Sequence, residues 1–230
     1  MRLVTTVVVF FLSLTIYAPG SVADEEAGFE VLFDGKSLAA WRGYRQNEVP
    51  PNWLIENGEI LGTGKGPDLL TKSVYGNFDF RFQWKLSASG NSGVVYRVSE
   101  NEERTQHKGP EYQLVNRKPI SAESRPTTAC GSLYGLYGES KITLQPDGEF
   151  NRSRIVVEGN RIRHWLNGEK VVDCEVGSED WNKKIEASQF HAWPQFAQNQ
   201  QGHIVLQAAD SPVWFRELHI KPLPRAPKDE

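Results

Sequence analysis

The sequence predicts an all-β protein built as a two-sheet antiparallel sandwich. The segment FDFRFQWKL (78–86) alternates apolar and polar residues without a break, which is typical of a strand with one buried face. Glycine-containing turns separate several such segments, and we find no convincing amphipathic helix and no internal repeat. The chain has 230 residues, of which 39% are hydrophobic, enough for one sizeable core.

The expected strands follow one another along the chain. In order, we expect strands or hairpins at 53–63, 78–86, 90–98, 109–116, 153–176, 202–209 and 213–223. Asn57-Gly58 and Asn167-Gly168 supply Asn-Gly pairs, the strongest short hairpin signal, and Gly159-Asn160 marks a third turn. Three long polar loops interrupt the pattern, at 99–110, 116–129 and 187–202. Loops of this length are commonly functional, and we expect them to border a binding site over the concave sheet.

Residues 1–23 have the layout of a secretory signal peptide. A basic Arg2 precedes an apolar run from Val7 to Ile16, and the small residues Ser21 and Ala23 fit a cleavage site before Asp24. The run is short for a membrane anchor, which needs about 20 residues. We therefore expect an exported protein, periplasmic or extracellular, with one domain over residues 24–230 and no stable membrane association.

Charge and cysteine content limit which partners, metal sites and disulfides the sequence can support. Removing Arg2 takes the 26 basic residues to 25 against 29 acidic ones, a net charge of −4, which argues against a nucleic-acid partner. Two cysteines, Cys130 and Cys174, are too few for a zinc site of their own. They fit one disulfide or two separate buried thiols equally well. The oligomeric state is not indicated by the sequence.

Polar residues inside two short strands are the main pointer to a site. In EYQLV, Glu111 and Gln113 share one face, because successive side chains of a strand point to opposite sides. In VVYRV, Arg97 faces away from Tyr96 and its apolar neighbours. A solvated outer face with an Arg–Glu surface pair explains this pattern about as well as a site does.

Three details favour a site. Gly90 and Gly93 flank Asn91-Ser92 and let another group approach the backbone closely. Gly109-Pro110 fixes the entry to the Glu111 strand, and long polar loops lie beside these strands. We therefore expect Arg97, Glu111 and Gln113 to converge in one concave pocket.

The order of motifs resembles that of the 3-keto-disaccharide hydrolase domain family over about residues 28–223. The motifs are FEVLFDGKSLAAW (29–41), WLIENGEILGTG, LLTKSVYGNFDFRFQWKL, GNSGVVYRV, GPEYQLVN, CGSLYGLYG, DGEFNRSRIVVEGNRIRHWLNGEKVVD and GHIVLQAADSPVWFRELHIKPL. The resemblance implies a concanavalin A-like jelly roll, a fold shared with laminin G-like modules. It also implies an exported enzyme that cleaves glycosides oxidised at C3 of the sugar.

A C3 ketone acidifies the hydrogen on C2, so that a base can remove it and the C1 substituent can leave by elimination. Such a site needs a base, donors for the enolate oxygen and a proton source for the leaving group. On this basis we expect Glu111 as base or metal ligand and Arg97 at the enolate. The expected substrate-binding residues are Asn91, Gln113, His107 and Gln207. No cofactor is required by the sequence; a divalent cation stays an open alternative, with its ligands unknown.

Other histidines and tryptophans carry weaker signals. His164, beside the Asn167-Gly168 turn, fits a structural role better than a catalytic one. His191 lies in a long loop and is a weaker acid–base candidate. The tryptophans that could stack on a sugar, although packing is their commoner fate, are Trp41, Trp53, Trp181 and Trp193.

The sequence departs from the family pattern at two places. Asn116 stands where an Asp usually follows EYQL, and Ala208-Ala209 replace the Asp-His of a closing LQDHG motif. A variant substrate, a changed site or a domain that binds sugar without turnover would each fit this departure. The alternative function is therefore a lectin-like carbohydrate-binding module. An ordinary endo-glucanase of this fold is excluded, because its Glu-x-Asp-x-x-Glu or Glu-x-Asp-x-Glu strand is missing.

Overall fold

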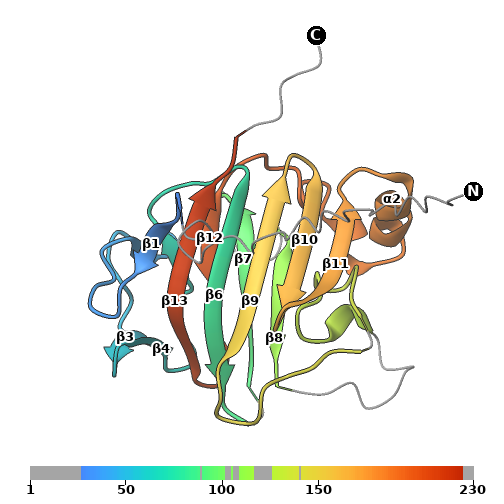
Figure 1. Cartoon of the computed structure of the whole chain (residues 1–230). Helices are drawn as coiled ribbons and strands as arrows, with labels where there is room; N and C mark the ends of the chain where they lie inside the picture. Colours follow the sequence, from blue (N-terminus) through green and yellow to red (C-terminus); the bar gives the residue numbers. More distant parts are fainter. Residues whose placement is uncertain are drawn as a thin grey trace, which may run out of the picture.

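The computed structural model describes residues 27–88, 90–101, 105, 109–116, 126–139 and 141–224. The proposed signal peptide (residues 1–23) and His107 therefore lie outside the described residues. The described part confirms the all-β sandwich expected from the sequence, with two antiparallel sheets packed face to face (Figure 1).

The larger sheet, called sheet A, runs in the order β11-β10-β9-β6-β13-β4-β3, and β1 pairs with β13. Its strands are β1 (Glu30–Phe33), β3 (Trp53–Glu56), β4 (Glu59–Gly62), β6 (Phe78–Leu86), β9 (Asn151–Glu158), β10 (Arg161–Leu166), β11 (Glu169–Glu175) and β13 (Val213–Pro222). The long strand β6 lies in its middle, between β9 and β13.

The smaller sheet, called sheet B, runs in the order β2-β5-β12-β7-β8. Its strands are β2 (Trp41–Gly43), β5 (Leu69–Thr71), β7 (Asn91–Val98), β8 (Glu111–Val115) and β12 (His203–Leu206). In Figure 1, β12, β7 and β8 lie behind sheet A. The short strands β2 and β5 complete this sheet and are too brief to be recognised from periodicity.

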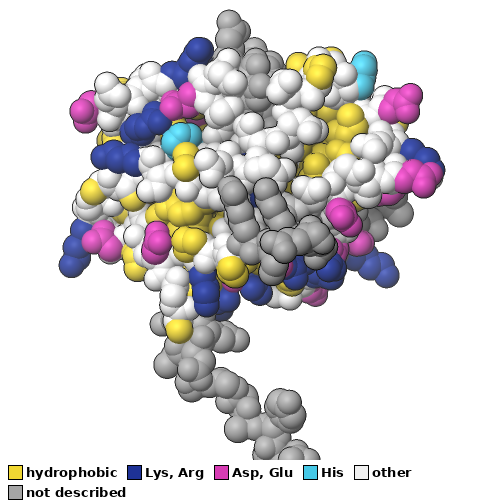
Figure 2. All heavy atoms as spheres, turned by 90° about the horizontal axis from the view of Figure 1, so that it is seen from above, with side chains coloured by type: hydrophobic (Ala, Val, Ile, Leu, Met, Phe, Trp, Pro, Cys, Tyr) yellow, Lys and Arg dark blue, Asp and Glu magenta, His cyan; other side chains and the backbone are white. Residues whose placement is uncertain are grey.

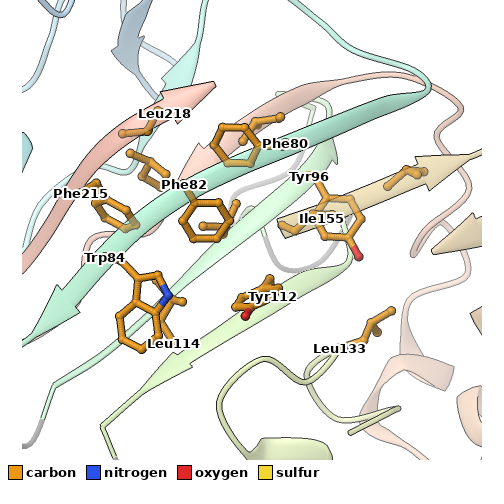
Figure 3. Packing of buried hydrophobic residues seen from close by; sticks show 14 of the residues in the cluster. Phe80, Phe82, Trp84, Tyr96, Tyr112, Leu114, Leu133, Ile155, Phe215 and Leu218 are labelled. Atoms are coloured by element: carbon orange, nitrogen blue, oxygen red, sulfur yellow. The ribbon is translucent and has the colours of Figure 1, made fainter. Parts of the chain in front are cut away.

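The core between the sheets is rich in aromatic residues, and the alternation of β6 explains why. Phe78, Phe80, Phe82, Trp84 and Leu86 of this strand are all buried in it. Sheet B contributes Val94 and Tyr96 from β7 and Tyr112 and Leu114 from β8. Figure 3 shows Tyr112 and Leu114 on the side of β8 that faces Phe82 and Trp84. The opposite side of β8 is therefore turned away from the core.

The turns follow the sequence signals. Asn57 and Gly58 both have positive φ angles (52° and 78°), as do Asn167 and Gly168 (50° and 90°), the geometry that type I′ hairpins require. One helix was not expected: α2 (Glu179–Glu186) is capped by Ser178, whose side chain accepts a hydrogen bond from the Trp181 backbone amide. It packs its single buried residue, Trp181, at the end of the sandwich beyond β11 (Figure 1). Short 3₁₀ turns occur at η2 (Pro126–Thr128) and η3 (Gln189–Ala192).

The surface carries both signs of charge. Figure 2 shows Lys and Arg side chains interspersed with Asp and Glu around the molecule seen from above. Within the described ranges, no helix has the length and apolar character that a membrane span needs. Both cysteines are buried free thiols, so the disulfide alternative is not realised in this structure.

Candidate active site

The candidate site lies on the outer face of sheet B, turned away from sheet A. Side chains alternate along β8, so that Tyr112 and Leu114 enter the core while Glu111 and Gln113 point outward. The floor of this face is a small apolar cluster from three strands of sheet B, next to Tyr44: Leu70, Val95, Val98 and Val205. The sequence prediction that Glu111 and Gln113 share a face is confirmed by this arrangement.

Glu111 is buried although it carries a carboxyl group. Its backbone pairs with Val95, and its side chain extends along the sheet over Gly93, where a Cβ atom would collide with Oε1. Only 7% of the residue is exposed. Burial, followed by the negative charge of Asp68, raises the pKa of Glu111 from 4.5 to about 8. Gly93 thus makes room for a carboxyl group that holds its proton up to unusually high pH.

Gln113 is oriented by a neighbour across the sheet. It lies opposite Gly93, and its Nε2 donates a hydrogen bond of 2.7 Å to Oδ1 of Asn91. Accepting this bond fixes the amide plane of Asn91. The two amide side chains therefore form one polar unit beside the carboxyl group of Glu111.

Asp68 was not expected from the sequence. It directly precedes β5 and faces the same side as Leu70, two residues later. Its Oδ1 accepts a hydrogen bond from the Ala208 amide (2.8 Å), and its Oδ2 accepts one from the Thr105 hydroxyl (2.9 Å). Burial raises the pKa of Asp68 against the effect of these bonds. The only sequence signal was a carboxylate at the start of the apolar pair Leu69-Leu70.

An open cleft of about 580 Å³ adjoins this group of side chains. Its lining residues are Lys65, Gly66, Asn91, Gln207, Ala208, Ala209, Asp210 and Ser211. Two of them, Asn91 and Gln207, were predicted as substrate-binding residues. The backbone amide of Gln207 donates to the Gly93 carbonyl (3.0 Å), and the backbone carbonyl of Gln207 accepts from Ser92 Oγ (2.8 Å). The segment that begins at Gln207 is thereby fastened to β7 next to Glu111.

The structure does not support the expected place of Arg97 beside Glu111. Arg97 has a φ of 54°, and the register between β7 and β12 shifts here, so the simple alternation of β7 ends at Tyr96. The buried guanidinium donates through Nε to the Gly76 carbonyl (3.1 Å) and through Nη2 to Asn77 Oδ1 (3.4 Å). A guanidinium in contact with Glu111 would lower the pKa of that carboxyl, whereas it is raised.

Comparisons with known proteins identify the family of this chain. The model of the 3-keto-alpha-glucoside-1,2-lyase-like domain family matches residues 28–221. The chain belongs to this family. A relative from Bacteroides thetaiotaomicron named 3-keto-disaccharide hydrolase is 28% identical over 228 residues, covering 85% of this chain and 79% of the relative.

Solved structures show the same fold. A protein of Parabacteroides distasonis ATCC 8503, provisionally named a glycosyl hydrolase, superposes with a TM-score of 0.80 at 31% identity, covering 89% of this chain and 98% of its own. A second protein of that organism with the same provisional name gives a TM-score of 0.63 at 25% identity, covering 85% and 99%. The carbohydrate-binding module CBM66 of Bacillus subtilis reaches 0.53 at 11% identity (79% and 95% covered), a likeness of fold alone. The jelly-roll expectation is thereby confirmed.

One of the two departures from the family motifs, Ala208-Ala209, falls at the cleft. Ala208 and Ala209 line the cleft, and the Ala208 amide is bonded to Asp68. Asn116 donates through Nδ2 to Asp147 Oδ1 (3.2 Å). No group of three or more His, Cys, Asp or Glu side chains that could hold a metal ion occurs among the residues that the structure describes.

The other histidine and tryptophan candidates that the structure describes do not line the cleft. His164 is fully buried, donates through Nδ1 to the Gly131 carbonyl (3.0 Å) and accepts at Nε2 from the Tyr96 hydroxyl (2.9 Å). Burial lowers its pKa to about 3, which fits the expected structural role. His191 is exposed. Three of the tryptophans considered for sugar stacking are buried in the core, namely Trp41, Trp53 and Trp181. The fourth, Trp193, is only partly buried.

Proposed function

We propose that the protein cleaves 3-keto-glycosides, with Glu111 as the base that removes the C2 proton. The observation that carries the proposal is the buried Glu111 carboxyl with a pKa of about 8, held over Gly93 beside an open cleft. A general base works best when its pKa lies near the operating pH. An ordinary surface glutamate would be a much weaker base.

The reaction follows from the ketone of the substrate. When the Glu111 carboxylate takes the C2 proton, the electron pair of the C–H bond forms the C2–C3 double bond, and the C3 oxygen becomes an enolate. The enolate then collapses, the C1–O bond breaks, and the departing oxygen takes a proton. The proton now on Glu111 is one source for it. Addition of water across C1 and C2 of the unsaturated ketone completes a net hydrolysis.

Neutral donors fit the enolate better here than a cation does. The amide groups of Asn91 and Gln207 line the cleft, and Gln113 orients Asn91. Donors held in place by the fold and aimed at a developing oxyanion stabilise it. We therefore assign the ring oxygens and the enolate to these three amides, in place of Arg97.

The decisive experiment compares Glu111→Gln with wild type on a 3-keto-glucoside, following release of the free aglycone. Gln keeps the shape and hydrogen-bonding capacity but has no basicity. The rate should fall by roughly 100-fold or more, whereas binding should change little. Glu56→Gln, at an exposed site at the end of β3, is the matched control and should keep full activity. Full activity of Glu111→Gln would remove Glu111 from the mechanism.

The second candidate function is binding of the sugar without turnover. It is favoured by one observation: the cleft wall carries Ala208 and Ala209 where the family motif has Asp and His. Calorimetric titration of wild type with the 3-keto-glucoside, together with the aglycone assay, separates the two functions. Heat of binding without release of aglycone would make this chain a binding module.

Export remains part of the proposal. The motif at residues 1–23 and the carbohydrate-acting family support a periplasmic or extracellular protein that meets oxidised glycosides outside the cytoplasm.

A further inference from the structure

Asp68 connects two segments that border the site. Through Ala208 it holds the cleft wall that follows β12, and it also accepts a hydrogen bond from Thr105, a residue between β7 and β8. Its own carbonyl accepts a hydrogen bond from the Tyr44 amide (2.8 Å), which ties the same residue to the chain after β2. Asp68 is thus a junction of three segments on the outer face of sheet B.

The register of sheet B brings Asp68 toward Glu111. Leu69 pairs with Leu206 and Leu70 with Val205, so the next position places Asp68 opposite Gln207. The backbone amide of Gln207 in turn donates a hydrogen bond to the carbonyl of Gly93, and the Glu111 carboxyl lies over this glycine. Asp68 and Glu111 therefore lie on the same face of sheet B and approach Gly93 and Gln207 from strands on either side of β12 and β7.

Both carboxyl oxygens of Asp68 are already used by the protein. One accepts from a backbone amide and the other from a buried hydroxyl, Thr105 being only 1% exposed. Each bond stabilises the ionised form of Asp68, because a carboxylate accepts hydrogen bonds with both oxygens. Asp68 is thus suited to act through its neighbours rather than by touching the sugar.

We propose that Asp68 is a positioning residue for the reaction at Glu111. Its hydrogen bonds hold the cleft wall at Ala208 and the side chain of Thr105 in place, and its carboxylate lies on the same face of sheet B as the Glu111 carboxyl. This inference rests on the proposed function, in which Glu111 is the base. It assigns a role to a residue that no sequence motif indicated.

Within the described residues, the other charged side chains discussed around this face form ion pairs with one another. Arg42 of β2 makes two bonds with Glu100, and Nε2 of His203 of β12 lies 3.9 Å from the same carboxylate. At the cleft rim Lys65 and Asp210 stand 3.6 Å apart and are largely exposed, so water screens them. Among the residues that the structure describes, Asp68 is therefore the charged group that acts on Glu111, and its negative charge contributes to the raised pKa of Glu111.

Two variants separate the charge of Asp68 from its hydrogen bonds. Asp68→Asn removes the charge, and its amide can still accept from Ala208 and donate to the Thr105 hydroxyl. Thr105→Val removes one hydrogen bond and leaves the charge. The readout is the pH profile of kcat/KM, which reports the ionisation of the free enzyme.

The expected profiles differ in a way that a purely structural role would not produce. Wild-type kcat/KM should rise with pH and level off above about 8, where Glu111 is ionised. In Asp68→Asn the like charge is gone, so the rise should move to lower pH by about one unit and the plateau should fall by roughly 10-fold. Thr105→Val should lower the plateau without moving the rise. Equal profiles for wild type and Asp68→Asn would overturn the proposal.

A second measurement does not depend on turnover. The carboxyl ¹³C signal of Glu111, assigned by its loss in Glu111→Gln, can be followed by NMR from pH 5 to 10 in wild type and Asp68→Asn. A midpoint that drops in Asp68→Asn supports the electrostatic link even if wild type releases no aglycone, in which case only the proposed function fails. An unchanged midpoint overturns the link.

Discussion

Glu111 occupies the space that a side chain at position 93 would fill. Gly93 and Glu111 lie on neighbouring strands of sheet B, β7 and β8, and a Cβ at Gly93 would overlap Oε1 of Glu111. The carboxyl group is thereby pressed against the sheet, where water reaches it poorly. Its high pKa is a direct consequence of this packing.

Gly93→Ala should therefore displace the Glu111 carboxyl and lower activity on a 3-keto-glucoside by roughly 10- to 100-fold. The φ angle of Gly93 is negative, so the alanine itself is not strained. In the Glu111→Gln background the same change should cost little more, because the base is already lost. Aglycone release by the two single variants and the double variant tests this. Additive losses would show that Gly93 acts independently of Glu111.

The raised pKa of Glu111 also predicts how stability depends on pH. The folded protein binds this proton up to about pH 8, and the unfolded chain only up to about 4.5. Between these values the folded state holds more protons, so the contribution of Glu111 to stability is greatest below pH 4.5 and is lost as pH rises toward 8.

Glu111→Gln lacks this dependence. Its free energy of unfolding should approach that of wild type at pH 5 and exceed it by on the order of a few kcal/mol at pH 9. Urea denaturation at both pH values measures the difference, and groups that do not interact with Glu111 cancel between the two proteins. A constant difference across the window would mean that Glu111 titrates normally.

His164 links the two sheets in the core, and its removal should destabilise the fold. His164→Leu leaves the Tyr96 hydroxyl and the Gly131 carbonyl without their partner. Buried polar groups left unpaired cost about 1–3 kcal/mol each, so we expect a loss of about 2–5 kcal/mol in urea denaturation. His191→Leu at an exposed position is the control and should change stability by less than about 0.5 kcal/mol. A loss no larger than that of the control would contradict a structural role for His164.

Export and cleavage of the signal peptide can be tested by measuring the intact mass of the exported protein. Expressed with its natural N-terminus in a host that exports it, the protein should be found outside the cytoplasm with Asp24 as its first residue. Intact-mass spectrometry of the exported fraction decides this. A membrane-bound product that retains Met1 would instead identify residues 7–16 as part of an anchor.

Much of the fold could be predicted from the sequence because strong alternation and turn residues coincide. The strand at 78–86 and the Asn-Gly hairpins are strongly patterned, and the structure confirms them. The strands β2 and β5 have only three residues each, too few for any period to appear. Helix α2 was missed because only Trp181 of its eight residues is buried, which leaves almost no apolar stripe.

The site was predictable in part for similar reasons. Glu111 and Gln113 lie within one regular strand, so the alternation of side chains along a strand predicts their common face. The same alternation predicts the facing of Arg97 only if the strand stays regular. The positive φ of Arg97 shows that the strand is irregular at this residue. Asp68 contributes through tertiary contacts with Thr105 and Ala208, which are 37 and 140 residues away in the sequence. No local pattern encodes such contacts.

The two cysteines carry a consequence for how this chain can be produced and handled. Burial raises the pKa of both thiols to about 12, so almost none of either is thiolate at neutral pH, and the thiolate is the reactive form. The fold is held without a covalent cross-link, and its sulfur atoms are poor targets for oxidants. The protein should therefore mature equally well in a reducing cytoplasm and in an oxidising compartment, with no need for a disulfide isomerase on either side of a membrane.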